Sequence, residues 1–152
     1  MATKKEWGNA TWYLFHTLSF KMKDEYFDEL KNDFLNICMK ICTNLPCPDC
    51  SEHATAVMKN VKRENIKTKK DLQLFFFDFH NEVNKRVKRS IFKEDQMFMY
   101  HKAITKNIVF NYITILSRKY NNIKLLTNSF HRDMSMNDFK NWIAHNSNKF
   151  NP

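Results

Sequence analysis

The sequence predicts an all-α fold, and three observations support this prediction. Among 152 residues there are one glycine and three prolines, too few for the turns that hairpins and strand–helix–strand crossovers need. Apolar residues make up 43% and aromatic residues 14% of the chain, more than disordered chains carry. Apolar side chains also recur at helical steps of three and four. We therefore expect one compact helical domain with an additional C-terminal element.

Three helices are predicted in the first 60 residues. The first covers residues 10–22 and places Trp12 and His16 on one side. The second covers residues 24–43, with apolar positions that step by three and four along one face: Phe27, Leu30, Phe34, Ile37 and Ile41. Pro46 ends this helix, and Pro48 suits the first turn of the third helix.

Two longer helices are predicted next. Thr68 and Asp71 have the spacing of a capping box, so a fourth helix is expected over residues 69–89. A fifth helix is predicted over residues 93–120, a stretch that is apolar on more than one side.

The C-terminal segment is predicted as a polar linker over residues 121–134 followed by a short sixth helix. We expect Ser135 and Asp138 to cap this helix, and three side chains to dock it: Phe139, Trp142 and Ile143. The expected division is a domain over residues 1–120 and a helical extension over residues 121–152, packed on or beside it.

The net charge of +9 is spread along the whole chain in short runs. Such a positive charge can favour the binding of nucleic acid, but dispersed basic side chains are more typical of solvated helix faces. The N-terminus lacks the pattern of a signal peptide, and no apolar run reaches the length of a membrane span. We therefore predict no nucleic-acid or membrane partner, and a location in the cytoplasm or in a virion.

The four cysteines raise a sharper question, because two lie in the stretch LPCPDCSEH at residues 45–53. A chain without a secretory signal seldom carries structural disulfides, so catalytic, metal-bound or free thiols are expected. A thioredoxin-like role needs strands and a downstream cis-proline. The only proline after Pro48 is Pro152, so this role is excluded.

Zinc remains an alternative, since five ligand side chains fall within sixteen residues: Cys38, Cys42, Cys47, Cys50 and His53. There is no second C-x-x-C pair, however, to close the usual loop around the metal. Cys38 and Cys42 are four apart on one helix, which separates their Cβ atoms by about 5–6 Å, too far for a relaxed disulfide. We expect both to be small buried hydrophobic residues.

A redox-active pair is the preferred interpretation. Cys47 would lie at the start of the third helix, where unpaired N–H groups and the helix dipole favour a thiolate. Cys50, one turn inside, is within disulfide reach. A dithiol that cycles needs an electron acceptor, and in a chain without strands the acceptor site must be built from helices.

Three separated segments share a family resemblance: WGNATWYLFHTLSF at residues 7–20, LPCPDCSEHA at 45–54 and FHNEVNKRVKR at 79–89. In this order and within an all-helical frame, they resemble the Erv/ALR flavin-linked sulfhydryl oxidases, most closely the branch encoded by large cytoplasmic DNA viruses. The resemblance implies a four-helix bundle that binds FAD, a fifth helix and, usually, a homodimer.

The resemblance also implies roles for single residues. Cys47 would exchange disulfides with a thiol-containing client protein, and Cys50 would pass electrons to FAD, from which O2 takes them to give hydrogen peroxide. The implied cofactor-binding residues are Trp7, Gly8, Trp12, His16, His53, Phe77, His80, Asn81, Val83, Asn84, Arg86 and Arg89; no metal is implied.

The chain departs from many cellular relatives because it has no cysteine after Cys50, and thus no additional shuttle pair there. We expect Cys47 to react directly with a client, for which a small redox shuttle protein is one candidate. The competing function is a basic helical module that binds nucleic acid or protein, with a structural zinc site as an option.

Overall fold

The computed structural model describes residues 2–118 and 123–152. Within these ranges the chain forms helices and their connections, with no strand, so the all-α prediction is confirmed. The α-helices there are α1 (Lys4–Lys21), α2 (Phe27–Thr43), α3 (Pro48–Asn60), α4 (Lys69–Arg86), α5 (Phe98–Lys102), α6 (Thr105–Leu116) and α7 (Ile123–Asn146).

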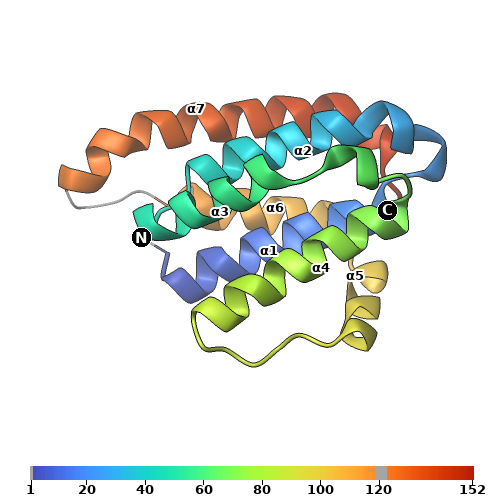
Figure 1. Cartoon of the computed structure of the whole chain (residues 1–152). Helices are drawn as coiled ribbons and strands as arrows, with labels where there is room; N and C mark the ends of the chain where they lie inside the picture. Colours follow the sequence, from blue (N-terminus) through green and yellow to red (C-terminus); the bar gives the residue numbers. More distant parts are fainter. Residues whose placement is uncertain (1, 119–122) are drawn as a thin grey trace.

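Helices α1 to α4 form an elongated bundle, and the later helices pack around it (Figure 1). Helix α1 contacts α4, α5 and α6, whereas α2 contacts α3 and α7. Helix α7 thus lies along the outer side of α2. The N-terminal ends of α1 and α3 and the C-terminal end of α4 lie toward the same end of the bundle (Figure 1).

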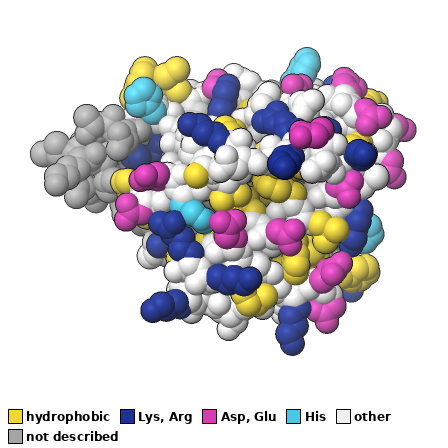
Figure 2. Space-filling view, in the orientation of Figure 1, with side chains coloured by type: hydrophobic (Ala, Val, Ile, Leu, Met, Phe, Trp, Pro, Cys, Tyr) yellow, Lys and Arg dark blue, Asp and Glu magenta, His cyan; other side chains and the backbone are white. Residues whose placement is uncertain are grey.

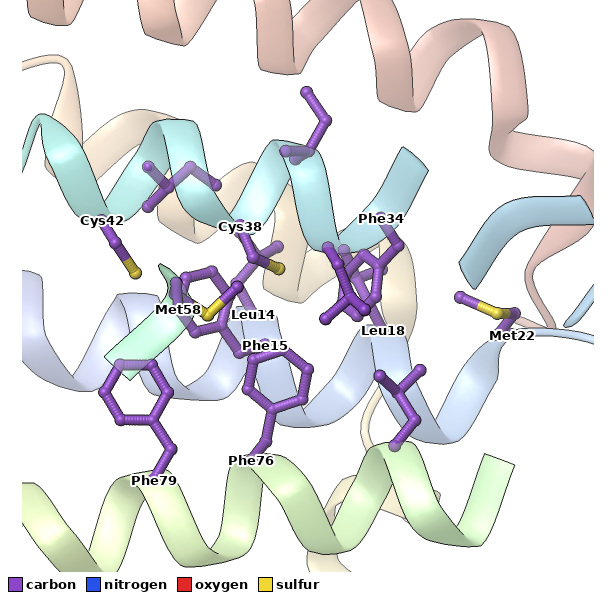
Figure 3. Close-up of a cluster of buried hydrophobic side chains, with 14 of the residues drawn as sticks. Leu14, Phe15, Leu18, Met22, Phe34, Cys38, Cys42, Met58, Phe76 and Phe79 are labelled. Atoms are coloured by element: carbon purple, nitrogen blue, oxygen red, sulfur yellow. The ribbon is translucent and has the colours of Figure 1, made fainter. Parts of the chain in front are cut away.

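The bundle core is built from phenylalanines that meet between helices (Figure 3). The ring of Phe76 in α4 lies 5.3 Å from that of Phe15 in α1 and 5.7 Å from that of Phe34 in α2, measured between centroids. All three are fully buried, as is Met58 from α3. Burying each such side chain contributes about 1.5–3 kcal/mol, so these contacts fix the spacing of the four helices.

Helix starts follow local signals. The predicted capping box at Thr68 and Asp71 is confirmed, and Pro48 occupies the first turn of α3. Helix α1 begins at Lys4 rather than at residue 10, because Thr3 and Glu6 form a second capping box. The Thr3 N–H donates to Glu6 Oε2 at 2.7 Å. This earlier start places residues 4–9 on the first turns of α1.

The prediction of one helix over residues 93–120 is wrong. The chain instead forms a 3-10 turn (Glu94–Met97), then α5, and, after extended backbone at Ala103 and Ile104, α6. The break lets the Tyr100 ring stack on His16 of α1, while the Thr105 N–H donates to the Pro152 carbonyl at 2.9 Å. Tertiary contacts thus override a continuous helical pattern; the end expected at residue 120 lies outside the described residues.

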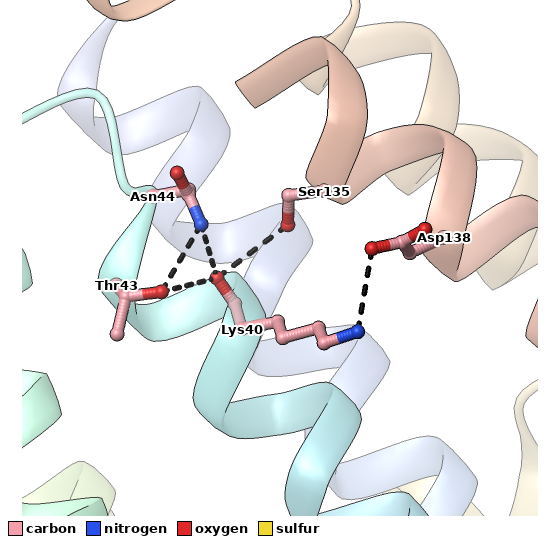
Figure 4. Close-up of polar contacts among 5 residues, drawn as sticks. All are labelled: Lys40, Thr43, Asn44, Ser135 and Asp138. Carbon is pink, nitrogen blue, oxygen red and sulfur yellow. Dashed lines mark hydrogen bonds and ion pairs between the residues drawn. The ribbon is translucent and has the colours of Figure 1, made fainter. Parts of the chain in front are cut away.

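The predicted polar linker over residues 121–134 is also wrong where the structure describes it, because α7 begins at Ile123; residues 121 and 122 lie outside the described part. Ser135 and Asp138 lie inside α7 and do not cap it. Both instead contact α2 (Figure 4): Ser135 Oγ donates to the Lys40 carbonyl, and Asp138 pairs with Lys40 Nζ at 3.3 Å.

Apolar contacts also dock α7. Phe139 is fully buried, and its ring lies 5.2 Å from that of Tyr112 in α6. Trp142 stacks on Phe34 at 6.1 Å, and Ile143 packs against the same core. The division of the chain at residue 120 stays a prediction.

Helix α4 ends at Arg86, three residues before its predicted end, because Lys88 adopts a left-handed conformation with a φ of 60°. The Arg89 N–H then donates to the Asn84 carbonyl at 2.8 Å, as in a Schellman motif. The turn reverses the chain, and residues 87–93, which we call the strap, run back along α4 toward α5 (Figure 1).

Replacing Lys88 with glycine should stabilise the protein, since glycine adopts this conformation without the steric cost that other residues bear. We expect Lys88→Gly to raise the free energy of unfolding in urea by about 0.5–1 kcal/mol. The matched control is Lys85→Gly, an exposed helical position in the same turn, which should lower it by about 0.5–1 kcal/mol. Equal destabilisation by both substitutions would contradict the assigned backbone conformation.

Candidate active site

A pocket of about 90 Å³ opens at the end of the bundle where α1, α3 and α4 come together. Each of these helices supplies part of its wall, together with the end of α2 and the strap. The lining residues are Lys4, Trp7, Gly8, Thr11, Trp12, Phe15, Cys42, Leu45, Cys50, His53, Ala54, Phe79, Val83, Arg86, Val87 and Arg89.

The two cysteines of the C-x-x-C motif lie at the start of α3. Cys47 is the N-cap residue, and its Sγ accepts the Cys50 N–H at 3.4 Å, so the predicted placement is confirmed. Cys50 lines the pocket, whereas Cys47 flanks it. Burial raises the pKa of the Cys50 thiol, and the neighbouring Cys47 raises it further against the opposing charge of Lys4. At neutral pH this direction favours the thiol form of Cys50 in the dithiol state.

The other two cysteines belong to the core (Figure 3). Cys38 and Cys42 are fully buried, and burial raises the pKa of Cys42 to about 12 and that of Cys38 well above its ordinary value. Both are neutral thiols that pack as small apolar groups. In residues 2–118 and 123–152, no group of three or more His, Cys, Asp or Glu side chains is gathered to hold a metal ion.

A stack of rings lies behind the pocket wall. Trp12 and His80 are parallel, with centroids 4.2 Å apart and planes at 7°. His16 Nε2 lies 2.9 Å from His80 Nδ1, within hydrogen-bond distance, and its ring stacks on Tyr100 at 4.4 Å. The helical spacing of Trp12 and His16 aligns both with His80, so α1 and α4 are joined here by rings and by one polar contact.

Both histidines of this stack are neutral. Burial lowers the pKa of His16 to about 3, with a further effect of His80. Burial also lowers the pKa of His80 to about 4, helped by the positive charge of Arg89. One ring nitrogen therefore donates and the other accepts between them. His16 Nδ1 is buried and has no hydrogen-bond partner within the protein, which leaves a polar atom unsatisfied beside the pocket.

Two asparagines of α4 hold the strap. Asn81 Nδ2 donates to the Phe92 carbonyl at 2.8 Å, and the Phe92 N–H donates to Asn81 Oδ1 at 2.8 Å. Asn84 Nδ2 donates to Asn81 Oδ1 at 3.3 Å. The Phe92 ring consequently lies against His80, with centroids 5.6 Å apart, and the Phe77 ring lies 6.2 Å from the Phe92 ring.

The structure therefore sorts the predicted cofactor-binding residues into two groups. Those that line the pocket are Trp7, Gly8, Trp12, His53, Val83, Arg86 and Arg89. Those that lie behind its wall, on α1 and α4, are His16, Phe77, His80, Asn81 and Asn84. Direct contact of either group with a cofactor stays a prediction.

Sequence reasoning missed several contributors. Lys4 and Thr11 line the pocket, and the Phe92 backbone exchanges two hydrogen bonds with the Asn81 side chain. The T-x-x-E signal at Thr3 would have extended α1 to include Lys4, and the spacing of three and four from Lys4 to Thr11 would have placed them on the Trp7 and Gly8 face. No local signal identifies Phe92.

The pocket suits a ligand with a planar aromatic ring and phosphates. A Cβ atom at Gly8 would meet nothing within 4 Å, so the missing side chain leaves open space in the wall. Lys4, Arg86 and Arg89 supply cations for phosphate. At about 90 Å³ the pocket is smaller than the ~300 Å³ or more of sites that enclose a large ligand, so a dinucleotide would be only partly enclosed.

The chain matches the model of the Erv1 / Alr family over residues 9–103. This match covers 95 of its 152 residues. The protein therefore belongs to the Erv1/Alr family, and the resemblance predicted from the sequence is confirmed. Helix α7 lies beyond the matched residues.

Individual relatives show the same relationship. The FAD-linked sulfhydryl oxidase of African swine fever virus (isolate Pig/Kenya/KEN-50/1950) is 29% identical over 104 residues, which are 67% of this chain and 86% of that protein. Protein 096R of Invertebrate iridescent virus 3 is 31% identical over 86 residues, 56% of this chain and 58% of that protein. FAD-linked sulfhydryl oxidase ERV1 of Oryza sativa subsp. japonica is 30% identical over 90 residues, 59% of this chain and 46% of that protein. The chain thus spans only about half the length of the last two.

The neutral histidine pair predicts acid sensitivity. The folded-state pKa values of about 3 and about 4 lie below the ordinary value of 6.5, so below pH 6.5 the unfolded chain binds more protons. The contribution of the two histidines to the free energy of unfolding should be fully present above pH 6.5. It should fall toward pH 4, by up to about 1.4 kcal/mol per pH unit for each histidine. Urea unfolding at several pH values should show a smaller slope for His80→Gln, and equal slopes would contradict this account.

If the Asn81 hydrogen bonds are removed, the strap should become more sensitive to protease. Asn81→Ala removes both hydrogen bonds to Phe92, as well as the one that Asn84 Nδ2 donates. Each bond to Phe92 has a net contribution of about 0.5–1.5 kcal/mol, so local opening of residues 87–93 should become about tenfold more frequent. Trypsin cleavage after Lys88 or Arg89, followed by mass spectrometry, measures this opening. Asn107→Ala, on the exposed face of α6, is the control and should match the parent protein. Equal cleavage of both variants would show that Asn81 does not hold the strap.

Proposed function

We propose that this protein is an FAD-dependent sulfhydryl oxidase that forms disulfides in client proteins. The observation that carries the proposal is the placement of the cysteine pair. Cys47 caps α3, and Cys50, one turn on, faces a pocket with aromatic walls and cationic residues. A dithiol beside a site suited to a ring with phosphates has a nearby acceptor for its electrons. The names of the viral and plant relatives support the same activity.

The two cysteine sulfurs have different roles in the proposed reaction. A client thiolate attacks Cys47 Sγ of the Cys47–Cys50 disulfide, and Cys50 leaves as a thiolate. A second client thiolate then attacks the client sulfur of the mixed disulfide and releases Cys47. The client has lost two electrons and the cysteine pair has gained them. When bound, FAD would supply the two-electron oxidising chemistry that returns the pair to the disulfide, with O2 as the final acceptor and hydrogen peroxide as the product.

The chain's own residues hold and orient the reacting groups. Trp12, Phe79 and the open space at Gly8 would receive the flavin ring, while Arg86 and Arg89 would pair with the pyrophosphate. His53, whose Nε2 lies 3.4 Å from Glu82 Oε1, stands one turn from Cys50 on the pocket side of α3. The ring stack and the strap lie behind the pocket wall, where they would hold Trp12 in position and keep water out of the pocket.

The partners that we propose are thiol-bearing proteins, one candidate being a small redox shuttle, with O2 as final acceptor and a second copy of the chain as homodimer partner. Within the described residues, no helix has the length and apolar character that crossing a bilayer requires. We propose the cytoplasm or a virion as the location. The face shown in Figure 2 intersperses Lys and Arg with Asp and Glu, which does not favour the alternative of a nucleic-acid-binding module.

The test is oxygen consumption with dithiothreitol by the purified protein. Cys47→Ala and Cys50→Ala should each lower the rate about a hundredfold or more, because each removes a sulfur that must exchange. Cys38→Ala is the matched control and should retain the activity, since its thiol is buried in the core. The parent protein should carry the yellow colour of bound flavin. A colourless protein with stoichiometric zinc, or full activity in either active-site variant, would refute the proposal.

A further inference from the structure

The last turn of α2 contains a carbonyl that cannot receive its usual helical hydrogen bond. In an α-helix each carbonyl accepts the N–H of the residue four positions later. For Cys42 that residue is Pro46, which has no N–H to donate. Because Cys42 is fully buried, its carbonyl needs a donor from another part of the protein.

Ser51, in the first turns of α3, supplies this donor. Its Oγ donates to the Cys42 carbonyl at 2.6 Å, a distance typical of a hydrogen bond from a hydroxyl group. Its N–H donates to the Cys47 carbonyl at 2.9 Å. Ser51 therefore binds the end of α2 through its side chain and the start of α3 through its backbone, next to the short connection formed by residues 44–47.

This hydrogen bond lies beside the cysteine pair. Ser51 directly follows Cys50, and Cys42 and Cys50 both line the pocket. Cys47 is the N-cap residue of α3, and helix ends are the parts of a helix that fray. Cys47 Sγ accepts the Cys50 N–H, a contact that requires the first turn of α3 to be formed. A bond that fixes this turn against α2 therefore also keeps the two sulfurs close and Cys50 at the pocket.

We propose that Ser51 is a positioning residue for the Cys47–Cys50 pair, and that its bond to the Cys42 carbonyl holds the first turn of α3 in the conformation in which the disulfide forms. The inference rests on the proposed function and adds to it the residue that sets the geometry of the reacting sulfurs. Ser51 takes no part in the exchange itself and acts through the two cysteines.

A fixed first turn favours the disulfide over the dithiol. With oxidised glutathione as the oxidant, a bond forms between Cys47 Sγ and Cys50 Sγ, and the pair gives up two electrons and two protons. The glutathione disulfide takes them and becomes two thiols. The equilibrium constant of this exchange measures the effective concentration of one cysteine thiol at the other. Opening of the first turn would lower this effective concentration.

The test is the equilibrium of the purified, flavin-loaded protein with reduced and oxidised glutathione under nitrogen, measured by alkylation of the thiols and mass spectrometry. Ser51→Ala should lower the equilibrium constant for disulfide formation about fivefold. Ser51→Thr keeps the hydroxyl and should restore the constant to within about twofold of the parent value. Thr55→Ala is the matched control, because it removes a hydroxyl one turn further along α3, and it should leave the constant unchanged.

Amide hydrogen exchange gives a second readout. In Ser51→Ala, residues 48–52 should exchange about fivefold faster than in the parent, whereas residues 56–60 at the other end of α3 should match it. An unchanged glutathione equilibrium in Ser51→Ala, or no recovery in Ser51→Thr, would overturn the positioning role. Absence of dithiothreitol turnover in the parent protein would instead overturn the proposed function. The two failures are distinguishable because the glutathione equilibrium requires only the cysteine pair.

Discussion

The contact of Phe76 with Phe15 and Phe34 is the constraint on which the candidate site depends. It joins α4 to α1 and α2, and every pocket residue on these helices is held at a set number of turns from it. Phe79 and Val83 lie one and two turns further along α4, and Trp12 lies one turn back along α1. Because protein interiors are close-packed, a change in this contact would move both walls of the pocket together.

The site breaks local rules that the rest of the core obeys. Two histidines and two asparagines lie within otherwise apolar helix faces, where each unsatisfied polar group costs about 1–3 kcal/mol. The asparagines are satisfied by the strap and by each other, and the histidines bond to each other. His16 Nδ1, by contrast, is buried without a hydrogen-bond partner in the protein. Such local conflicts are expected at functional sites.

Local chemistry explains what could be predicted from the sequence. Pro46 and Pro48 separate α2 from α3, and the capping box at Thr68 starts α4, so these boundaries need no tertiary information. Cys47 was placed at the helix start for the same reason. The break between α5 and α6 could not be predicted, because it depends on Tyr100 meeting α1 and on Thr105 meeting the end of the chain.

Long-range contacts likewise explain what was missed in the site. The link between Asn81 and Phe92 follows from the reversal at Lys88, and the docking of α7 on α2 depends on contacts of Ser135 and Asp138 with Lys40. A helical stripe identifies the face that is buried, but not the helix that covers it. The motif residues were therefore predictable as a set, whereas their division between the pocket and its supporting wall required the structure.

We propose that the dithiol at the start of α3 passes its electrons into the pocket through Cys50. Anaerobic titration of the flavin-loaded protein with dithiothreitol tests it most directly. The visible flavin absorbance should bleach after two electrons per flavin and return with air, and Cys50→Ala should bind flavin without rapid bleaching. Equally fast bleaching in Cys50→Ala would contradict it.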